Sequence, residues 1–110
     1  MTEQSCKYLS DILMAIELIE DFTCEIKTFH DYEQDRKTQS AVERQLVIIG
    51  EALNQFKKLE PAVMIEHSRQ IISFRHRLVH AYDSIDNSVV WSILVRYLKP
   101  FKEEIVAISI

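Results

Sequence analysis

The segment Arg75–Tyr82, RHRLVHAY, holds the side chains of this sequence that are best suited to chemistry. Arg75 stays protonated and can bind two phosphate oxygens at once. His80 titrates near neutral pH and can act as an acid or a base, and Tyr82 can stack on a base or hydrogen-bond a phosphate. Cleavage of RNA without a metal needs such groups: a base at the 2′-hydroxyl, an acid at the leaving 5′-oxygen and a cation at the phosphorane.

The spacing of Arg75 and His80 leaves two interpretations open. Five residues on a regular helix rotate by about 140°, so the two side chains share no face unless the helix ends near His80 and the long arginine reaches forward. A helix C-terminus also favours cations, and spacing alone favours this simpler explanation. One such set is small for an active site, but a two-fold homodimer would supply two arginines and two histidines.

A metal site is a third interpretation of the same segment. His76 and His80 stand four residues apart, a spacing that can place two imidazoles on one ion. No third ligand is obvious, because Asp83 would have to fold back, and no metal is expected. The remaining histidines, His30 and His67, are expected at the surface.

A second group of unusual residues lies upstream, in a helical pattern. Gly50 in a helix costs about 1 kcal/mol relative to alanine, which indicates a close helix–helix contact. Arg44 and Glu51 stand seven residues apart and share a face two turns apart. They indicate an ion-pair network or a partner surface, and solvated helix charges explain them equally well.

The composition is that of one nearly all-helical domain spanning residues 1–110. The 110 residues are 47% hydrophobic and include only one Gly and two Pro, so helix breakers are scarce. The net charge of −4 argues against general coating of nucleic acids. Residues 67–80 nevertheless hold three arginines, three histidines and no acidic residue, and they form one basic, titratable patch.

The location is expected to be cytoplasmic. Met1–Ser5 leads straight into an amphipathic pattern without a signal peptide, and no apolar run approaches the roughly 20 residues needed to span a bilayer. Cys6 and Cys24 cannot bridge within one helix. They are predicted to be buried or half-buried thiols of a reducing compartment.

Hydrophobic periodicity predicts four main helices and short ones between them. The first runs from Tyr8 to about Thr28, with Phe22 among its apolar residues, and 30–39 carries a turn or short helix. The others are expected at about Thr38 to Leu59, at about Ser68 to Val79, and from Val89 onward, where Pro100 kinks or interrupts the helix before Phe101–Ile108. Pro61 suits the first turn of a short helix holding Val63, Met64 and Ile65, and Asp83 or Asp86 is the expected N-cap of the last helix. Short connections between such helices predict an up-and-down antiparallel bundle.

Two segments resemble the HepT-like toxins of the HEPN superfamily. Ala41–Phe56, AVERQLVIIGEALNQF, is similar to the E-R-x-L-x-I-I-G-E-A segment of that family. Arg75, His80 and Tyr82 match its R-x4-H-x-Y motif, and the YDSID that begins at Tyr82 resembles the sequence downstream of it. The similarity runs over most of the chain and implies a HEPN-like fold.

The resemblance implies a toxin of a type VII toxin–antitoxin system. Arg75 and His80 match the catalytic pair of a metal-independent endoribonuclease without cofactors, which acts on cellular RNA such as tRNA or mRNA. Tyr82 matches the tyrosine that an MntA-type nucleotidyltransferase antitoxin modifies with AMP. Family members form homodimers whose two motifs line one cleft, and neither DNA nor a membrane is an expected partner. Supporting roles are expected for Arg44, Glu51, His76 and Asp83.

Two positions depart from the superfamily pattern. His76 stands where Asn or Asp is common, and Ala81 stands where Gly is frequent. Neither departure removes the Arg–His pair. The alternative to an enzyme is a non-catalytic helical subunit that presents Tyr82 to a nucleotidyltransferase. A purely structural bundle is disfavoured because Arg75, His80 and Tyr82 occur together.

Overall fold

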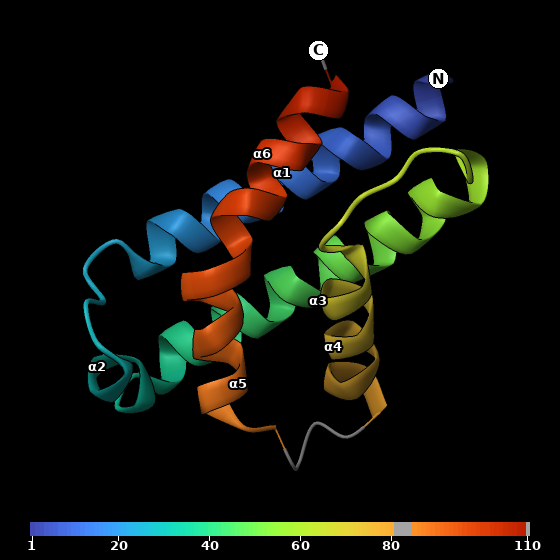
Figure 1. Ribbon diagram of the computed structural model, residues 1–110. Helices are drawn as coiled ribbons and strands as arrows, with labels where there is room; N and C mark the ends of the chain where they lie inside the picture. Colours follow the sequence, from blue (N-terminus) through green and yellow to red (C-terminus); the bar gives the residue numbers. More distant parts are fainter. Residues whose placement is uncertain (81–84, 110) are drawn as a thin grey trace.

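The computed structural model of the chain describes residues 1–80 and 85–109 (Figure 1). Within these ranges all regular structure is helical. The elements are α1 (Glu3–Thr23), α2 (Phe29–Glu33), α3 (Arg36–Leu59), α4 (Ser68–His80), α5 (Asn87–Ser92), the π-helix η2 (Ile93–Tyr97) and α6 (Leu98–Ser109). The predicted all-α bundle of four main helices plus short ones is confirmed.

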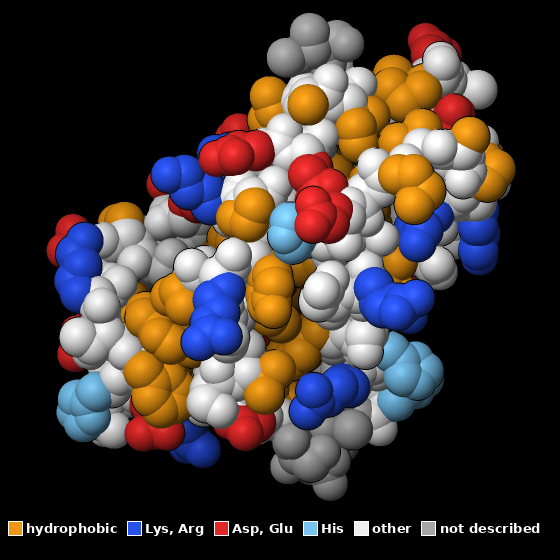
Figure 2. Space-filling view, viewed as in Figure 1, with side chains coloured by type: hydrophobic (Ala, Val, Ile, Leu, Met, Phe, Trp, Pro, Cys, Tyr) orange, Lys and Arg blue, Asp and Glu red, His pale blue; other side chains and the backbone are white. Residues whose placement is uncertain are grey.

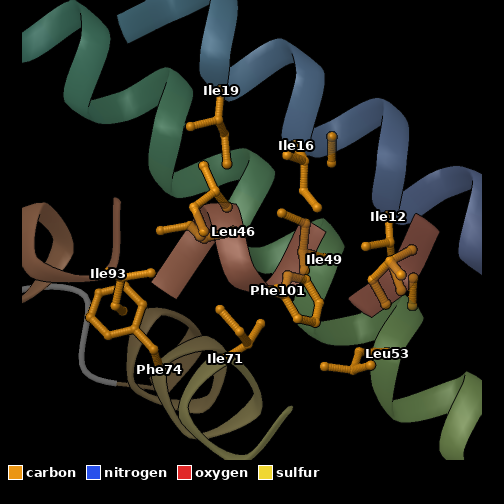
Figure 3. Close-up of a cluster of buried hydrophobic side chains, with 14 of the residues drawn as sticks. Ile12, Ile16, Ile19, Leu46, Ile49, Leu53, Ile71, Phe74, Ile93 and Phe101 are labelled. Atoms are coloured by element: carbon orange, nitrogen blue, oxygen red, sulfur yellow. The ribbon is translucent and has the colours of Figure 1, made fainter. Parts of the chain in front are cut away.

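The two longest helices, α1 and α3, lie side by side and run in opposite directions (Figure 1). Their apolar residues recur every three or four positions, so each helix buries one continuous stripe. The stripes meet in the core, where Ile12, Ile16 and Ile19 of α1 face Leu46, Ile49 and Leu53 of α3 (Figure 3). This hairpin is the frame against which the other helices pack.

Helix α4 packs against α3, and the column formed by α5, η2 and α6 runs back in the opposite direction (Figure 1). Ile71 and Phe74 of α4 close the core from one side, and Ile93 and Phe101 of the column close it from another (Figure 3). The α4 segment therefore has one face in the core, while its charged residues lie on the remaining faces.

Pro100 changes the type of the last helix without breaking it. Proline has no N–H and its ring crowds the carbonyl four residues earlier. The wider turns of η2 directly before α6 accommodate the proline ring. At the end of η2 the Leu98 N–H donates a hydrogen bond to the Ile93 carbonyl, five residues earlier. The expected interruption at Pro100 is thus a π-helical segment within a continuous column (Figure 1).

Several boundaries differ from the prediction because side chains cap and tie the helix ends. The first helix begins at Glu3, since Thr2 accepts a hydrogen bond from the Ser5 N–H, and it ends at Thr23. The short helix expected at Val63–Ile65 was wrong: turns and irregular chain connect α3 to α4 there. Hydrogen bonds hold both ends of this connection, from Ser5 to Glu60 (2.7 Å) and from backbone N–H groups to Glu104.

The surface also corrects two predictions. Cys6 and Cys24 are both exposed rather than buried or half-buried, and Phe22 is exposed although it continues the apolar pattern of α1. Asp86 is the N-cap of α5, as expected, and accepts from the Ser88 N–H at 2.8 Å; Asp83 lies outside the described residues. In the described part of the chain, each helix is too short or too polar to cross a membrane.

Candidate active site

The side chain of Arg75 on α4 packs against α3 at Gly50. A Cβ added at Gly50 would overlap the Cβ of Arg75 and would lie only 2.5 Å from its Cγ. Gly50 is buried in α3 and has ordinary helical φ, so the position needs glycine for space rather than for backbone freedom. The close helix–helix contact predicted at Gly50 is confirmed, and its partner is the stem of the candidate catalytic arginine.

Glu51, the next residue of α3, holds the other end of the same side chain. Its Oε2 lies 2.6 Å from Nη2 of Arg75, and the two side chains are 47% and 26% exposed. The Arg75 Nε is buried and has no hydrogen-bond partner among the described residues. Arg75 is therefore fixed by packing on Gly50 and by an ion pair, while one of its strong donors stays unused.

A pocket of about 330 Å³ opens beside this ion pair, between α1, α3 and α4. Arg44, Glu51 and Arg75 line it together with Tyr8 and Asp11. The predicted shared face of Arg44 and Glu51 is confirmed, but Glu51 pairs with Arg75 from another helix. The pocket thus presents two guanidinium groups, and carboxylates beside them.

His80 and His76 lie at the exposed C-terminal end of α4. Their ring centroids are 4.5 Å apart, as the four-residue spacing requires. Among residues 1–80 and 85–109, neither ring forms a hydrogen bond or ion pair with Arg75, whose ion-pair partner is Glu51. Tyr82 and Asp83 lie outside the described residues.

A group of three potential metal ligands occurs elsewhere in the described chain, at Glu66, His67 and Glu104. The Glu104 carboxylate already accepts from the Glu66 N–H (2.6 Å), the His67 N–H (3.2 Å) and the His67 ring (Nδ1–Oε1 2.5 Å). Burial raises the pKa of this carboxyl, but the hydrogen bonds outweigh burial, so the pKa of Glu104 is lowered overall. The group fastens the α3–α4 connection to α6.

The surface prediction for His67 was wrong. Its side chain is only 19% exposed, and its ring also packs against Tyr97, tilted by 51° with the centroids 5.9 Å apart. His30 is exposed as predicted. The periodicity of the sequence could not identify His67 as bound, because its partner Glu104 is 37 residues away.

Sequence reasoning also missed a second hollow, an open groove of about 410 Å³ between α4 and the α5–η2 segment. Phe74, Val89 and Ile93 give it an apolar floor, and Arg77 and Tyr97 stand among its polar lining. Figure 2 shows hydrophobic side chains along this face with Lys or Arg on either side. Scattered serines and a glutamine carry no motif, so nothing in the sequence singles the groove out.

Comparisons with known proteins agree with this architecture. The sequence matches the family described as "Ribonuclease HepT-like" over residues 12–108. It is 49% identical over 88 residues to "Probable ribonuclease HepT" of Thermococcus cleftensis, covering 76% of each chain. It is 34% identical over 93 residues to "Putative RNase MJ0127" of Methanocaldococcus jannaschii, covering 80% of this chain and 73% of that protein. The comparison with solved structures found no match.

The match covers the elements that carry the site. Residues 12–108 include Gly50 and Glu51 on α3 and the whole of α4 with Arg75 and His80. The contact between Gly50 and Arg75 also explains physically why a glycine–glutamate pair accompanies the R-x4-H motif in the chain. This chain belongs to the HepT-like ribonuclease family.

Proposed function

We propose that this protein is the toxin of a type VII toxin–antitoxin system and a metal-independent endoribonuclease acting on cellular RNA, tRNA or mRNA. Membership of the HepT-like ribonuclease family and the ribonuclease names of its relatives support RNA as the substrate. The single observation that carries the catalytic assignment is the placement of Arg75. Its side chain packs on Gly50, the one glycine of the sequence. Its buried Nε has no hydrogen-bond partner among residues 1–80 and 85–109.

In the proposed reaction, Arg75 binds the non-bridging oxygens of the scissile phosphate. One His80 accepts the proton of the 2′-hydroxyl, the 2′-oxygen bonds to phosphorus, and the bond to the 5′-oxygen breaks as a second His80 protonates it. The products are a 2′,3′-cyclic phosphate and a 5′-hydroxyl. The Glu51 carboxylate already pairs with Nη2 of Arg75. The phosphate must therefore bind the other guanidinium N–H groups or displace Glu51 from Nη2.

Two histidines in one site require a homodimer, which we include in the proposal. Met14 and Leu18 stand one turn apart on α1 and are 62% and 40% exposed, so one chain leaves them uncovered. The hollow beside them shares Asp11 and Ile48 with the Arg75 pocket. A second copy on this face would therefore lie next to the Arg75 pocket. Light scattering of Leu18→Glu tests this, with a persistent dimer as the contrary result.

The proposed control is AMPylation of Tyr82 by an MntA-type nucleotidyltransferase antitoxin. Each AMP would add negative charge and bulk beside the basic end of α4, where Arg75, Arg77 and His80 lie, and would repel RNA. Tyr82→Phe is expected to abolish the modification and to leave toxicity intact. Loss of toxicity in this variant would instead give the hydroxyl a catalytic role.

Expression of the chain alone in a bacterium tests the enzyme. Growth arrest that His80→Ala relieves is the expected result, and Arg75→Ala is expected to abolish RNA cleavage while the helical circular dichroism signal survives. His30→Ala, at an exposed histidine on α2, is the matched control and is expected to remain toxic. Harmless expression of the wild-type chain would contradict the proposal.

The second candidate is a non-catalytic subunit that presents Tyr82 and its basic surroundings to a nucleotidyltransferase. The observation favouring it is the ion pair of Arg75 with Glu51, which neutralises the arginine within one chain. Purified protein distinguishes the two functions. An enzyme releases 2′,3′-cyclic phosphate from RNA in the presence of a chelator, whereas the subunit binds its partner and cuts nothing.

A further inference from the structure

The groove between α4 and the α5–η2 segment combines an apolar floor, one arginine and several uncharged polar side chains. The protein carries a net charge of −4, yet among residues 1–80 and 85–109 those that line this groove include Arg77 and no carboxylate. The nearby Asp86 is engaged with the Ser88 N–H and hydroxyl, and the charge of Arg77 helps to lower the pKa of Asp86 after those hydrogen bonds. The groove thus holds one guanidinium group in its lining, with the charged Asp86 carboxylate near it.

Two aromatic rings stand in the groove. Phe74 forms part of its floor, with the guanidinium carbon of Arg77 5.9 Å from the ring centroid. Tyr97 lines the same groove and is half-buried, and the ring of His67 packs against its ring with centroids 5.9 Å apart and planes tilted by 51°. A ring fixed in this way offers a face on which a planar group can stack with little loss of side-chain entropy.

Hydrogen-bonding groups complete the lining. Gln70 and Ser73 are exposed on α4, and Ser92 faces the same space from α5. An amide and hydroxyls can pair with the edge of a base or with a ribose, while Arg77 can bind a phosphate. The volume of about 410 Å³ falls within the range of small-molecule pockets.

From these contacts we infer that this groove binds one nucleotide of the RNA, with its base on Tyr97 and a phosphate at Arg77. Phe74 and Arg77 stand on the same helix as Arg75 but line a different hollow, since side chains one or two positions apart on a helix face different ways. The nucleotide would therefore belong to a part of the RNA that lies across α4 from the scissile phosphate. The groove would then contribute affinity and base preference, while Arg75 and His80 perform the cleavage. The inference rests on the proposed function only in taking RNA as the ligand.

Binding is measured on the His80→Ala protein, so that RNA stays intact, by fluorescence anisotropy of a labelled single-stranded ten-nucleotide RNA of mixed sequence. Tyr97→Ala is expected to weaken binding roughly five- to 150-fold, the range for loss of one base–aromatic stack. Tyr97→Phe keeps the ring and is expected to stay within about threefold of the parent. Gln70→Glu, an exposed substitution that cannot unfold a core, places a carboxylate in the groove and is expected to weaken binding as well.

The charge contribution has a matched control. Arg77→Ala is expected to reduce the slope of log affinity against log salt by about 0.7, the value for one phosphate contact of a single strand. Arg96→Ala removes the same charge from an exposed position of η2 outside the groove lining and is expected to leave the slope unchanged. Equal effects of the two variants would mean diffuse attraction and would overturn the inference.

The same chemistry would accept the AMP that the proposed antitoxin adds to Tyr82. Protein made without a nucleotidyltransferase, with Tyr82 shown by intact mass to be unmodified, restricts the nucleotide to the RNA. Unchanged affinity in Tyr97→Ala and Gln70→Glu would overturn the inference, and so would their conversion of a dimer to monomers, which would make the groove a protein interface. Cleavage is scored separately with His80 present, so binding without cleavage refutes only the proposed function.

Discussion

The contact between Gly50 and Arg75 makes Gly50→Ala the most informative substitution in the chain. Alanine is the better helix former by about 1 kcal/mol, so at an ordinary helical site this change would stabilise the protein. Here the new methyl would lie 2.5 Å from the Arg75 Cγ and closer still to its Cβ, whereas carbon atoms prefer about 3.5–4.0 Å. Rotation about χ1 can move Cγ, but Cβ is fixed by the backbone of α4.

Relief therefore requires α3 and α4 to separate by about 1 Å along their contact. Overpacking of this kind costs about 1–3 kcal/mol, and the fixed Cβ places the cost at the upper end. After subtracting the helix-propensity gain, we expect Gly50→Ala to lower the free energy of unfolding by about 2 kcal/mol. The displaced α4 would also carry Arg75 away from its pocket, so RNA cleavage is expected to fall further than stability alone explains.

Urea unfolding followed by circular dichroism measures this change at constant m-value. Ser40→Ala, at an exposed position of the same helix, is the control and is expected to stabilise slightly through helix propensity alone. A Gly50→Ala protein that is more stable than the parent, as Ser40→Ala should be, would refute the close contact and the positioning of Arg75 that we derive from it.

Three further substitutions test individual contacts. Tyr32→Phe removes a buried hydroxyl that has no hydrogen-bond partner in the described chain, and burial raises the pKa of this hydroxyl. The substitution is expected to raise the free energy of unfolding by about 1 kcal/mol. Clear destabilisation in urea would reveal a hydrogen-bond partner of the hydroxyl. Glu104→Gln is expected to lower the free energy of unfolding at pH 7. The lowered pKa of the Glu104 carboxyl stabilises the fold above the usual value of 4.5, and this contribution disappears as pH falls through the lowered pKa. A stability difference between variant and parent that persists below this pH range would contradict the prediction. Glu51→Gln removes a half-exposed ion pair with Arg75 and is expected to change the free energy of unfolding by less than about 1 kcal/mol. RNA cleavage is expected to fall, because Glu51 no longer holds the guanidinium in place. Unchanged cleavage would show that Glu51 does not position Arg75.

The sequence predicted those features of the fold that depend on residues close together along the chain. Apolar spacing identified the four long helices, because a helix that must bury one face repeats its apolar residues every three or four positions. The same reasoning identified Asp86 as a cap and Gly50 as a close contact. Each of these depends on neighbours within a turn or two, or on the intrinsic cost of a residue in a helix.

The predicted helix boundaries were wrong where a hydrogen bond to a residue far along the sequence determines where a helix ends. The segment 61–65 has a proline suited to start a helix, but hydrogen bonds from Ser5 to Glu60 and from the following backbone to Glu104 hold the connection in an irregular course. The apolar residue Phe22 stays 38% exposed at the edge of a hollow that it shares with Lys37, Thr38 and Ala41 at the start of α3. Helical periodicity cannot report such partners, since they lie far away along the sequence.

The sequence by itself determined the helical class, the family and the residue types of the candidate site: an arginine, a histidine and a tyrosine within eight positions. The tertiary structure alone decided that Arg75 lies on Gly50 and pairs with Glu51, that His67 is hydrogen-bonded to Glu104, and that Phe74, Arg77 and Tyr97 line one groove between α4 and the α5–η2 segment. The physical reason is range. Helix formation is governed by interactions over three or four residues, whereas packing and ion pairs join side chains whose proximity depends on how whole helices cross.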